Sequence, residues 1–446
     1  GSDLVGLGNR MRHSYFVRWT RSPLRIVPGV EMPSYTKAVH GVLGDDADAQ
    51  LEALWKTLAD PRFEPPTDPA AVEQYIVVEK DAPPRIIRDV FTNPKENGGG
   101  YIARAFAIGF ENQHSVLIDL DTLTLRSWNF GDFARQRTIG KSWYWDMAGT
   151  PTISGNSPKS DYALITRIVD GQPIRETDLK TIEPHQENGT VGQLIDYSAN
   201  RDSVRFRFRM NFLVDDKQVA LDVVETFKMT RRNGSAPNSG LLREITVSEL
   251  PQGYDLRISR LNESGKPKFG HPSVDRFDRD GDGWTTKDEH GKPFGRYFSR
   301  IENEGGKAYC VIRYSSRLEP PPLSVTLKPL PPAEAHKITS MPGFEGVQLP
   351  VSTKIMPTAM TVLDDGRLAF ASLEGHVYIA KDTDGDGVED ELTMFEEGLS
   401  APYGIIQDGD SLLVSHKPEI LRLRDTDGDG RADERTVFSS GWGIND

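Results

Sequence analysis

A six-residue string, Asp-Thr-Asp-Gly-Asp-Gly, occurs twice near the C-terminus, at 382–387 and at 425–430, so the two copies start 43 residues apart. The same offset aligns Gly366 with Gly409 and several apolar positions around them. A period of about 40 to 45 residues, built from short β-rich runs with a turn between them, is typical of one four-stranded propeller blade. The sequence therefore predicts a β-propeller in the C-terminal part of the chain.

The predicted propeller region, 335–446, has room for roughly two and a half blades, whereas a closed propeller takes about four to eight. We therefore expect an incomplete β-propeller that belongs to a longer protein. Apolar side chains that neighbouring blades would cover should then be exposed, or should pack against the middle of the chain instead. These side chains are Leu368, Phe370, Val377, Ile379, Leu413, Ile420 and Leu423.

Two proline-rich stretches, 61–69 and 320–332, separate the propeller region from the rest of the chain and divide that rest in two. Between them the pattern changes to period two, because apolar and polar residues alternate from Val204 to Phe212. This alternation is typical of a strand with one buried face. We expect a mainly antiparallel β-sandwich over 70–318.

Residues 1–60 are predicted to be all-α, which makes the expected fold multidomain. A short helix is expected at 14–20 and a longer one at 46–58, with Asp45 as its cap. Met32 lies between them in a proline-flanked loop. A methionine there either fills a gap in the packing or serves as an axial haem ligand, and the residues alone leave both alternatives open.

Composition excludes several functions. The formal charge of −13 argues against a nucleic-acid partner, because phosphate contacts need a clustered basic face. No apolar run approaches the roughly 18 residues that cross a bilayer. The single cysteine, Cys310, excludes an internal disulfide framework. Because no nucleophile elbow, phosphate loop or zinc spacing occurs, the sequence offers no catalytic residue.

The segment 278–289 fits the twelve-position calcium loop, with carboxylates at positions one, three and five, glycine at six and glutamate at twelve. The predicted ligands are Asp278, Asp280, Asp282, the carbonyl of Trp284, Thr286 and Glu289. The alternative is an Asp-rich surface turn that its own side-chain hydrogen bonds stabilise.

The two repeated strings predict calcium loops of a second kind, at 382–390 and 425–433. Each keeps the first three carboxylates and adds a fourth at position nine, but threonine replaces the bidentate glutamate at position twelve, so weaker binding is expected. The predicted ligands are Asp382, Asp384, Asp386, Val388 and Asp390 in the first copy, and Asp425, Asp427, Asp429, Arg431 and Asp433 in the second. An empty turn is again the alternative.

Aromatic side chains are concentrated between positions 128 and 145. They are Trp128, Phe130, Phe133, Trp143, Tyr144 and Trp145. Such a cluster could present a stacking platform to a sugar or form the core of the sandwich. We favour the core, because aromatic side chains dominate protein interiors.

The N-terminal segments 1–4, 15–23 and 28–33, followed by the helix at 46–58, resemble the second half of a class I cytochrome c domain. In that family the proline-flanked methionine is the sixth haem ligand, which implies this role for Met32. The family attaches haem through C-x-x-C-H, and this chain has no such motif. We therefore expect the haem-attachment half to precede the first residue.

The C-terminal segments 357–360 and 364–368, together with the two acidic loops, resemble bacterial membrane-bound dehydrogenases similar to quinoprotein glucose and sorbosone dehydrogenases. In that group a propeller is fused to a c-type cytochrome. The resemblance implies a fragment of an exported oxidoreductase, periplasmic or at the cell surface, that oxidises a sugar or alcohol and passes electrons to haem c and an electron-acceptor protein.

The same resemblance leaves open whether pyrroloquinoline quinone is bound and whether parts outside this stretch associate with a membrane. It implies that the catalytic residues lie beyond Asp446. The competing interpretation is a calcium-stabilised, carbohydrate-binding surface protein without catalysis.

Overall fold

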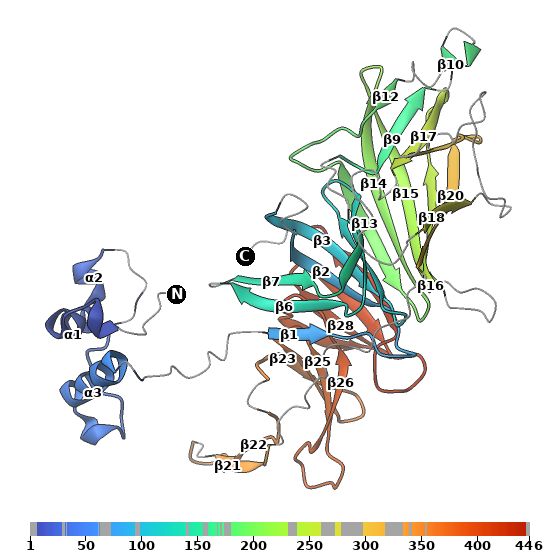
Figure 1. Ribbon diagram of the computed structural model, residues 1–446. Coiled ribbons are helices and arrows are strands. Elements are labelled where there is room, and N and C mark those ends of the chain that lie inside the picture. The colour runs from blue at the N-terminus through green and yellow to red at the C-terminus, as the bar shows by residue number, and fades with distance from the viewer. Residues whose placement is uncertain are drawn as a thin grey trace. The chain divides into compact units, whose positions relative to one another are not determined.

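The structure is a computed structural model. It describes residues 7–28, 32, 34–60, 62, 73–93, 99–139, 142–154, 159–166, 168–169, 172–173, 180–230, 239–259, 273–277, 298–316, 333–338, 341–352 and 355–442. The predicted calcium loop at 278–289 lies outside these residues. Contacts within the chain define two compact units, Gly1–Ala71 and Val72–Asp446. The first unit is helical and the second is built of β-strands (Figure 1).

The first unit contains the helices α1 (His13–Arg21), α2 (Pro23–Ile26) and α3 (Ala47–Ala59) and the short 3₁₀ turns η1 (Leu7–Asn9) and η2 (Leu43–Asp45). The helices expected at 14–20 and 46–58 are thus confirmed as α1 and α3. None of the described helices is long and apolar enough to span a membrane.

The cap of α3 differs from the expectation by one residue. Asp46, not Asp45, accepts hydrogen bonds from the backbone N–H groups of Asp48 (2.9 Å) and Ala49 (3.2 Å). Asp45 belongs to the preceding turn, where its φ is +61° and its carboxylate accepts the Gly41 N–H at 2.6 Å. The prediction of Asp45 as the cap was wrong because two adjacent aspartates compete for one capping position.

The apolar faces of the helices form a small core of their own. Leu7, Phe16 and Leu58 are buried, and partly buried side chains such as Met11 and Trp55 pack against them. This core is local to the first unit, where α1 and α3 bury apolar side chains against each other and against η1.

An eight-stranded sheet opens the second unit, in the order β1-β6-β7-β2-β3-β4-β5-β8. Its strands are β1 (Glu73–Ile76), β2 (Arg85–Thr92), β3 (Tyr101–Gly109), β4 (His114–Asp119), β5 (Thr124–Phe130), β6 (Ala134–Ile139), β7 (Ser142–Met147) and β8 (Thr150–Ser154).

A ten-stranded sheet follows, in the order β18-β20-β16-β15-β14-β13-β30-β29-β28-β27. Its strands are β13 (Gly192–Ala199), β14 (Ser203–Val214), β15 (Lys217–Thr230), β16 (Ser239–Ser248), β18 (Ser273–Phe277), β20 (Lys307–Ser316), β27 (Gly404–Asp408), β28 (Ser411–His416), β29 (Glu419–Arg424) and β30 (Glu434–Ser440). Ser198 on β13 pairs with Thr436 on β30, so strands from the middle of the chain and from the second repeat share one sheet.

Four smaller sheets complete the described fold. Two are four-stranded, in the orders β12-β9-β17-β19 and β23-β24-β25-β26, and the pairs β10-β11 and β21-β22 form the others. Their strands are β9 (Tyr162–Thr166), β10 (Ile168–Val169), β11 (Gln172–Pro173), β12 (Thr181–Ile182), β17 (Tyr254–Ser259), β19 (Phe298–Ile301), β21 (His336–Ile338), β22 (Gly346–Gln348), β23 (Pro357–Val362), β24 (Leu368–Ser372), β25 (Val377–Lys381) and β26 (Glu391–Glu396).

Each copy of the 43-residue repeat folds into four consecutive antiparallel strands, β23 to β26 and β27 to β30. The two copies touch along their first strands, β23 and β27, and through the turn that follows β23. The backbone N–H of Asp364 donates to the side-chain oxygen of Gln407 at 2.7 Å, 43 positions further on. The period seen in the sequence is therefore a structural unit of four strands.

One continuous core joins the repeats to the middle of the chain. Along β14, residues alternate between buried and accessible, and Phe206 and Phe208 are completely buried. Val377, Ile379 and Leu423 from the repeats belong to the same buried cluster. For these three side chains, packing against the middle of the chain is confirmed.

The other four side chains of that set differ among themselves. Phe370 is buried in a separate small cluster with Tyr378, and Leu368 packs against that cluster. Leu413 and Ile420 are half-buried. The second repeat therefore leaves one of its faces partly open.

The aromatic cluster is mostly core. Four of its side chains, Trp128, Phe130, Phe133 and Trp145, are buried, whereas Trp143 and Tyr144 are half-buried. The favoured interpretation is confirmed for the four buried side chains, because a buried ring cannot present a stacking surface to a sugar.

Candidate functional site

The acidic loops occupy equivalent places in the two repeats, the first between β25 and β26 and the second between β29 and β30. Their glycines determine the turn. Gly385 and Gly387 have φ of +80° and +86°, and Gly428 and Gly430 have φ of +81° and +87°. Glycine populates this region without the steric cost that a Cβ atom brings. The two loops therefore share one backbone conformation.

The first aspartate of each loop is held by backbone N–H groups. Asp382 accepts hydrogen bonds from Gly385 (2.7 Å) and Gly387 (2.8 Å). Asp425 accepts the equivalent pair, at 2.7 and 2.9 Å. The bonds from Gly387 and Gly385 lower the pKa of Asp382, because they stabilise the ionised carboxylate.

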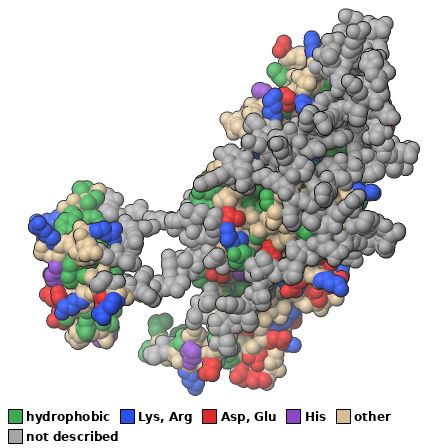
Figure 2. Space-filling model, viewed as in Figure 1, with side chains coloured by type: hydrophobic (Ala, Val, Ile, Leu, Met, Phe, Trp, Pro, Cys, Tyr) green, Lys and Arg blue, Asp and Glu red, His purple; other side chains and the backbone are tan. Residues whose placement is uncertain are grey.

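The next two aspartates complete a group of three carboxylates. In each loop, carboxylate oxygens from positions one, three and five lie within 4.8 Å of one another. Asp386 accepts the N–H of Val388 and Asp429 accepts the N–H of Arg431, both at 2.8 Å. In Figure 2, Asp and Glu side chains gather at the lower end of the second unit, where β26 lies in Figure 1. Such a group favours a cation.

The aspartate at position nine is hydrogen-bonded to a threonine of its own loop. Asp390 accepts the Thr383 hydroxyl at 2.8 and 2.7 Å and its N–H at 3.0 Å. Asp433 accepts the hydroxyl and N–H of Thr426 in the same way, at 2.6 and 2.9 Å. These carboxylates close the base of each loop, and within the described residues they stand outside the groups of three.

The two loops differ in their surroundings. In the second, Asp427 Oδ2 lies 2.7 Å from Arg201 Nη1, and the N–H of Ala432 donates to the carbonyl of Phe395 on the first repeat at 2.8 Å. Arg431 Nη2 lies 3.4 Å from Glu397 Oε1. No ion pair reaches the three carboxylates of the first loop within the part of the chain that the structure describes. The second loop is thus attached to its neighbours on both sides.

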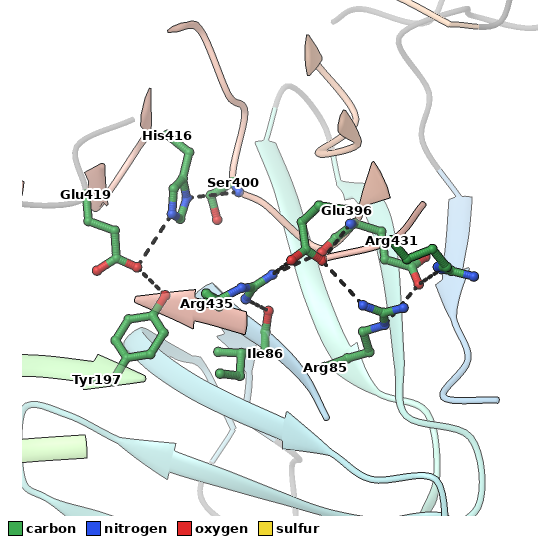
Figure 3. Close-up of polar contacts among 10 residues, drawn as sticks. Arg85, Ile86, Tyr197, Glu396, Ser400, His416, Glu419, Arg431 and Arg435 are labelled. Atoms are coloured by element: carbon green, nitrogen blue, oxygen red, sulfur yellow. Dashed lines mark hydrogen bonds and ion pairs between the residues drawn. The ribbon is translucent and has the colours of Figure 1, made fainter. Parts of the chain in front are cut away.

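A buried polar junction connects the two repeats with β2 and β13 (Figure 3). We define it by its buried charged and polar residues, which are Arg85, Arg88, Tyr197, Glu396, Glu397, His416, Glu419 and Arg435.

One half of the junction is formed by two glutamates and two arginines. Arg435 Nη2 lies 3.0 Å from Glu396 Oε2, and Arg85 Nε lies 3.5 Å from Glu397 Oε1. Arg435 also donates to the backbone carbonyl of Ile86 at 2.8 Å. Burial raises the pKa of Glu397, although the charges of Arg85 and Arg431 oppose this shift.

The other half of the junction is centred on Glu419, which is completely buried. Its carboxylate accepts a hydrogen bond from Tyr197 (2.5 Å) and one from Arg88, and it lies 3.5 Å from His416 Nε2. Burial alone would raise the pKa of Glu419, but His416 and Arg88 lower it overall. A chemical site needs access to solvent, so we assign the junction a structural role.

The sequence analysis missed this junction, although one signal was present. Glu419, Leu421 and Leu423 lie on the same face of β29, and both leucines are completely buried. A charged residue on the apolar face of a strand indicates a buried ion pair. Its partners could not be inferred, because Arg88 is 331 positions away.

Met32 is half-buried. The apolar cluster of its unit contains Met11 among the described residues. The haem-ligand role of Met32 therefore stays a prediction.

Residues 356–446 match a domain of unknown function, DUF7133. The matched segment contains both repeats and both acidic loops. No curated protein matches the chain.

Proposed function

We propose that this chain binds Ca²⁺ at the two acidic loops of its C-terminal repeats. One observation carries the proposal, which is that the same group of three carboxylates is built twice, with oxygens within 4.8 Å of one another in each loop. Three like charges at this distance repel one another unless a cation compensates them. Carboxylate and carbonyl oxygens are the ligands that Ca²⁺ prefers.

The ligand set predicts moderate affinity. Thr393 and Thr436 stand where the bidentate glutamate of a high-affinity loop belongs, and the position-nine carboxylates are already hydrogen-bonded to threonines. We expect a dissociation constant on the order of 10⁻⁴ M, as in extracellular calcium modules.

Thermal unfolding with and without Ca²⁺ tests this proposal. At about ten times its dissociation constant, the ion should stabilise the fold by roughly 1.4 kcal/mol per site. The matched control is a variant with Asp384→Asn and Asp427→Asn, which keeps both turns but weakens both groups of carboxylates. A melting temperature that is identical in millimolar Ca²⁺ and in chelator would show that the loops are empty turns.

We propose further that the repeats belong to a β-propeller of an exported, haem-linked oxidoreductase that acts on a sugar or alcohol. Three features support this proposal: the 43-residue period, the four-stranded unit that each period forms, and the resemblance of the helical unit to half of a cytochrome c. The apolar cluster around Phe16 contains Met11 and not Met32 among the described residues, and the attachment motif is not in this sequence, so the haem part of the proposal rests on the resemblance. No residue of the chain is assigned a catalytic role.

Haem spectroscopy on a longer protein that contains the attachment motif tests the second proposal. Met32→Ala should alter the spectrum of the reduced haem and lower its potential, because a thioether ligand raises it. The competing function, calcium-stabilised carbohydrate binding without catalysis, predicts sugar binding with no reduction of an added electron acceptor.

A further inference from the structure

A second group of buried charges lies in the core of the second unit and shares no residue with the junction. It consists of Arg243 on β16, Glu225 on β15 and Asp161, which directly precedes β9. Strands β15 and β16 belong to the ten-stranded sheet, and β9 belongs to the sheet β12-β9-β17-β19. The N–H of Leu125 on β5, in the eight-stranded sheet, donates to Asp161 at 3.0 Å. The charged group therefore connects three sheets.

Glu225 and Arg243 form a bidentate ion pair. Arg243 Nε donates to Glu225 Oε2 at 2.6 Å, and Arg243 Nη2 donates to Glu225 Oε1 at 2.8 Å. The hydroxyl of Tyr162 donates to the same carboxylate. Two parallel N–H···O bonds are among the strongest contacts between a guanidinium and a carboxylate. The charge of Glu225 is therefore compensated by Arg243.

Asp161 shares the same guanidinium group at a longer distance. Arg243 Nη1 lies 3.2 Å from Asp161 Oδ2, which is also the oxygen that accepts the Leu125 N–H. Within the described residues, Arg243 is the one cation paired with either carboxylate of the group. One positive charge therefore faces two carboxylates.

The other titratable side chains that face this group are Tyr162 on β9 and Tyr314 on β20. Burial raises the pKa of both hydroxyls, that of Tyr314 to about 12, so both stay neutral near pH 7. With both carboxyl groups ionised, the buried group thus carries one negative charge in excess.

An uncompensated charge is costly in a protein interior, and a buried carboxyl group responds by binding a proton. A proton on Asp161 makes the group neutral and leaves the pair of Glu225 with Arg243 intact. Burial raises the pKa of Asp161 to about 6. The charge of Arg243 opposes this rise, whereas that of Glu225 adds to it.

We propose that Asp161 is a proton-binding site through which mildly acid solution strengthens the packing of β9 against the ten-stranded sheet. In the unfolded chain the carboxyl group binds its proton only near the ordinary value of 3.8. Between about pH 6 and pH 4 the folded state therefore binds more protons than the unfolded state, so this group stabilises the fold as the pH falls. The inference depends on neither bound metal nor haem.

Denaturant unfolding of the unchanged chain and of Asp161→Asn, in chelator and across pH, tests the inference. Asparagine has the shape of the protonated side chain but takes up no proton in this range. Relative to the variant, the unchanged chain should become more stable as the pH falls. The ratio of the two unfolding constants should change roughly 50-fold between about pH 7.5 and pH 4, because the pKa of Asp161 is about 6 in the folded chain and 3.8 in the unfolded chain.

The matched control is Asp222→Asn. Asp222 lies on the accessible face of β15, where Arg209 Nε donates to its Oδ1 at 2.7 Å. This hydrogen bond lowers the pKa of Asp222, so the unchanged chain should lose stability relative to this variant as the pH falls. The two substitutions should therefore change the pH profile in opposite directions.

NMR of the folded, unchanged chain gives a measurement that does not need a variant to fold. The Cγ signal of Asp161 should titrate with a midpoint near pH 6. The inference is overturned if this signal shows no proton uptake between about pH 7 and pH 5, or if folded Asp161→Asn and the unchanged chain have parallel pH profiles.

Discussion

The two acidic loops share their sequence, their backbone conformation and their internal hydrogen bonds, yet they differ in what surrounds them. The first loop has no ion pair to its three carboxylates within the described chain. In the second, Asp427 pairs with Arg201, and Arg431 reaches Glu397 in the buried polar junction. One motif is thus an exposed turn in the first repeat and part of the contacts between sheets in the second. We therefore expect changes around the second loop to affect stability more strongly.

Removing the junction partner of the second loop should have the largest effect. Glu397→Ala takes away the carboxylate that faces Arg431 and Arg85, and breaking a buried pair costs about 3–5 kcal/mol. Denaturant unfolding measures this loss. The control is Val388→Ala. Val388 stands in the first loop at the position that Arg431 occupies in the second, and its replacement should lower the free energy of unfolding by less than about 1 kcal/mol. Equal losses in the two variants would contradict the difference between the loops.

The pH dependence of stability should distinguish the repeats next. His376 in the first repeat occupies the position that Glu419 occupies in the second. Burial lowers the pKa of His376 to about 4, so the folded chain keeps it neutral while the unfolded chain takes up a proton below about pH 6.5. Because the unfolded state then binds more protons, His376 alone should contribute a loss of stability of roughly 3 kcal/mol between about pH 6.5 and pH 4.

The comparison of His376→Phe with the unchanged chain isolates this effect. Other groups also titrate in this window. Burial lowers the pKa of His114 to about 3 and also lowers the pKa of His416 in the second repeat, and it raises the pKa of Asp161 to about 6, which acts in the opposite direction. The variant should lose less stability than the unchanged chain as the pH falls. Parallel pH profiles of the two proteins would refute the assignment to His376.

Replacing the second glycine of each loop with alanine gives a matched pair of variants with smaller expected effects. Gly387 and Gly430 have nearly the same φ, +86° and +87°, so alanine should cost each loop about 1–2 kcal/mol. A Cβ at Gly430 would also lie 3.3 Å from Thr393 Cγ2, whereas nothing lies within 4 Å at Gly387. Thermal unfolding should therefore show a greater loss for Gly430→Ala, and a greater loss for Gly387→Ala would contradict the packing of the second loop.

Arg201→Ala should have the smallest effect on stability and a distinct effect on metal binding. The Arg201–Asp427 pair is exposed, so its loss should cost less than about 1 kcal/mol. Removing this guanidinium should raise the calcium affinity of the second loop, because arginine and Ca²⁺ compete for the same carboxylate. Calcium titrations would count against such competition if the affinity were unchanged or lower.

The sequence predicted the features that depend on neighbouring residues. Helix α3, the alternation along β14 and the turns at Gly387 and Gly430 each follow from residues a few positions apart. The pairing of Ser198 with Thr436 could not be predicted in the same way, because it depends on which apolar faces meet when distant segments pack together. The charged junction around Glu419 has the same origin.

The candidate site likewise combines features that follow from neighbouring residues with features that depend on other hydrogen bonds and distant segments. The three carboxylates of each loop follow from spacing alone, since positions one, three and five of a tight turn point to one side. The position-nine carboxylate depends on a competing hydrogen bond from Thr383, which the spacing pattern of calcium loops does not include. The contact of Arg201 with Asp427 bridges separate strands and was not expected.

Counting bound calcium in loop variants tests the central claim most directly. Equilibrium dialysis should show that Asp384→Asn and Asp427→Asn each lose one equivalent of Ca²⁺ relative to the unchanged chain, and that the double variant loses two. Calcium should also still raise the melting temperature of Asp384→Asn, because the second loop is the one attached to the fold. The same amount of bound Ca²⁺ in all four proteins would contradict the account.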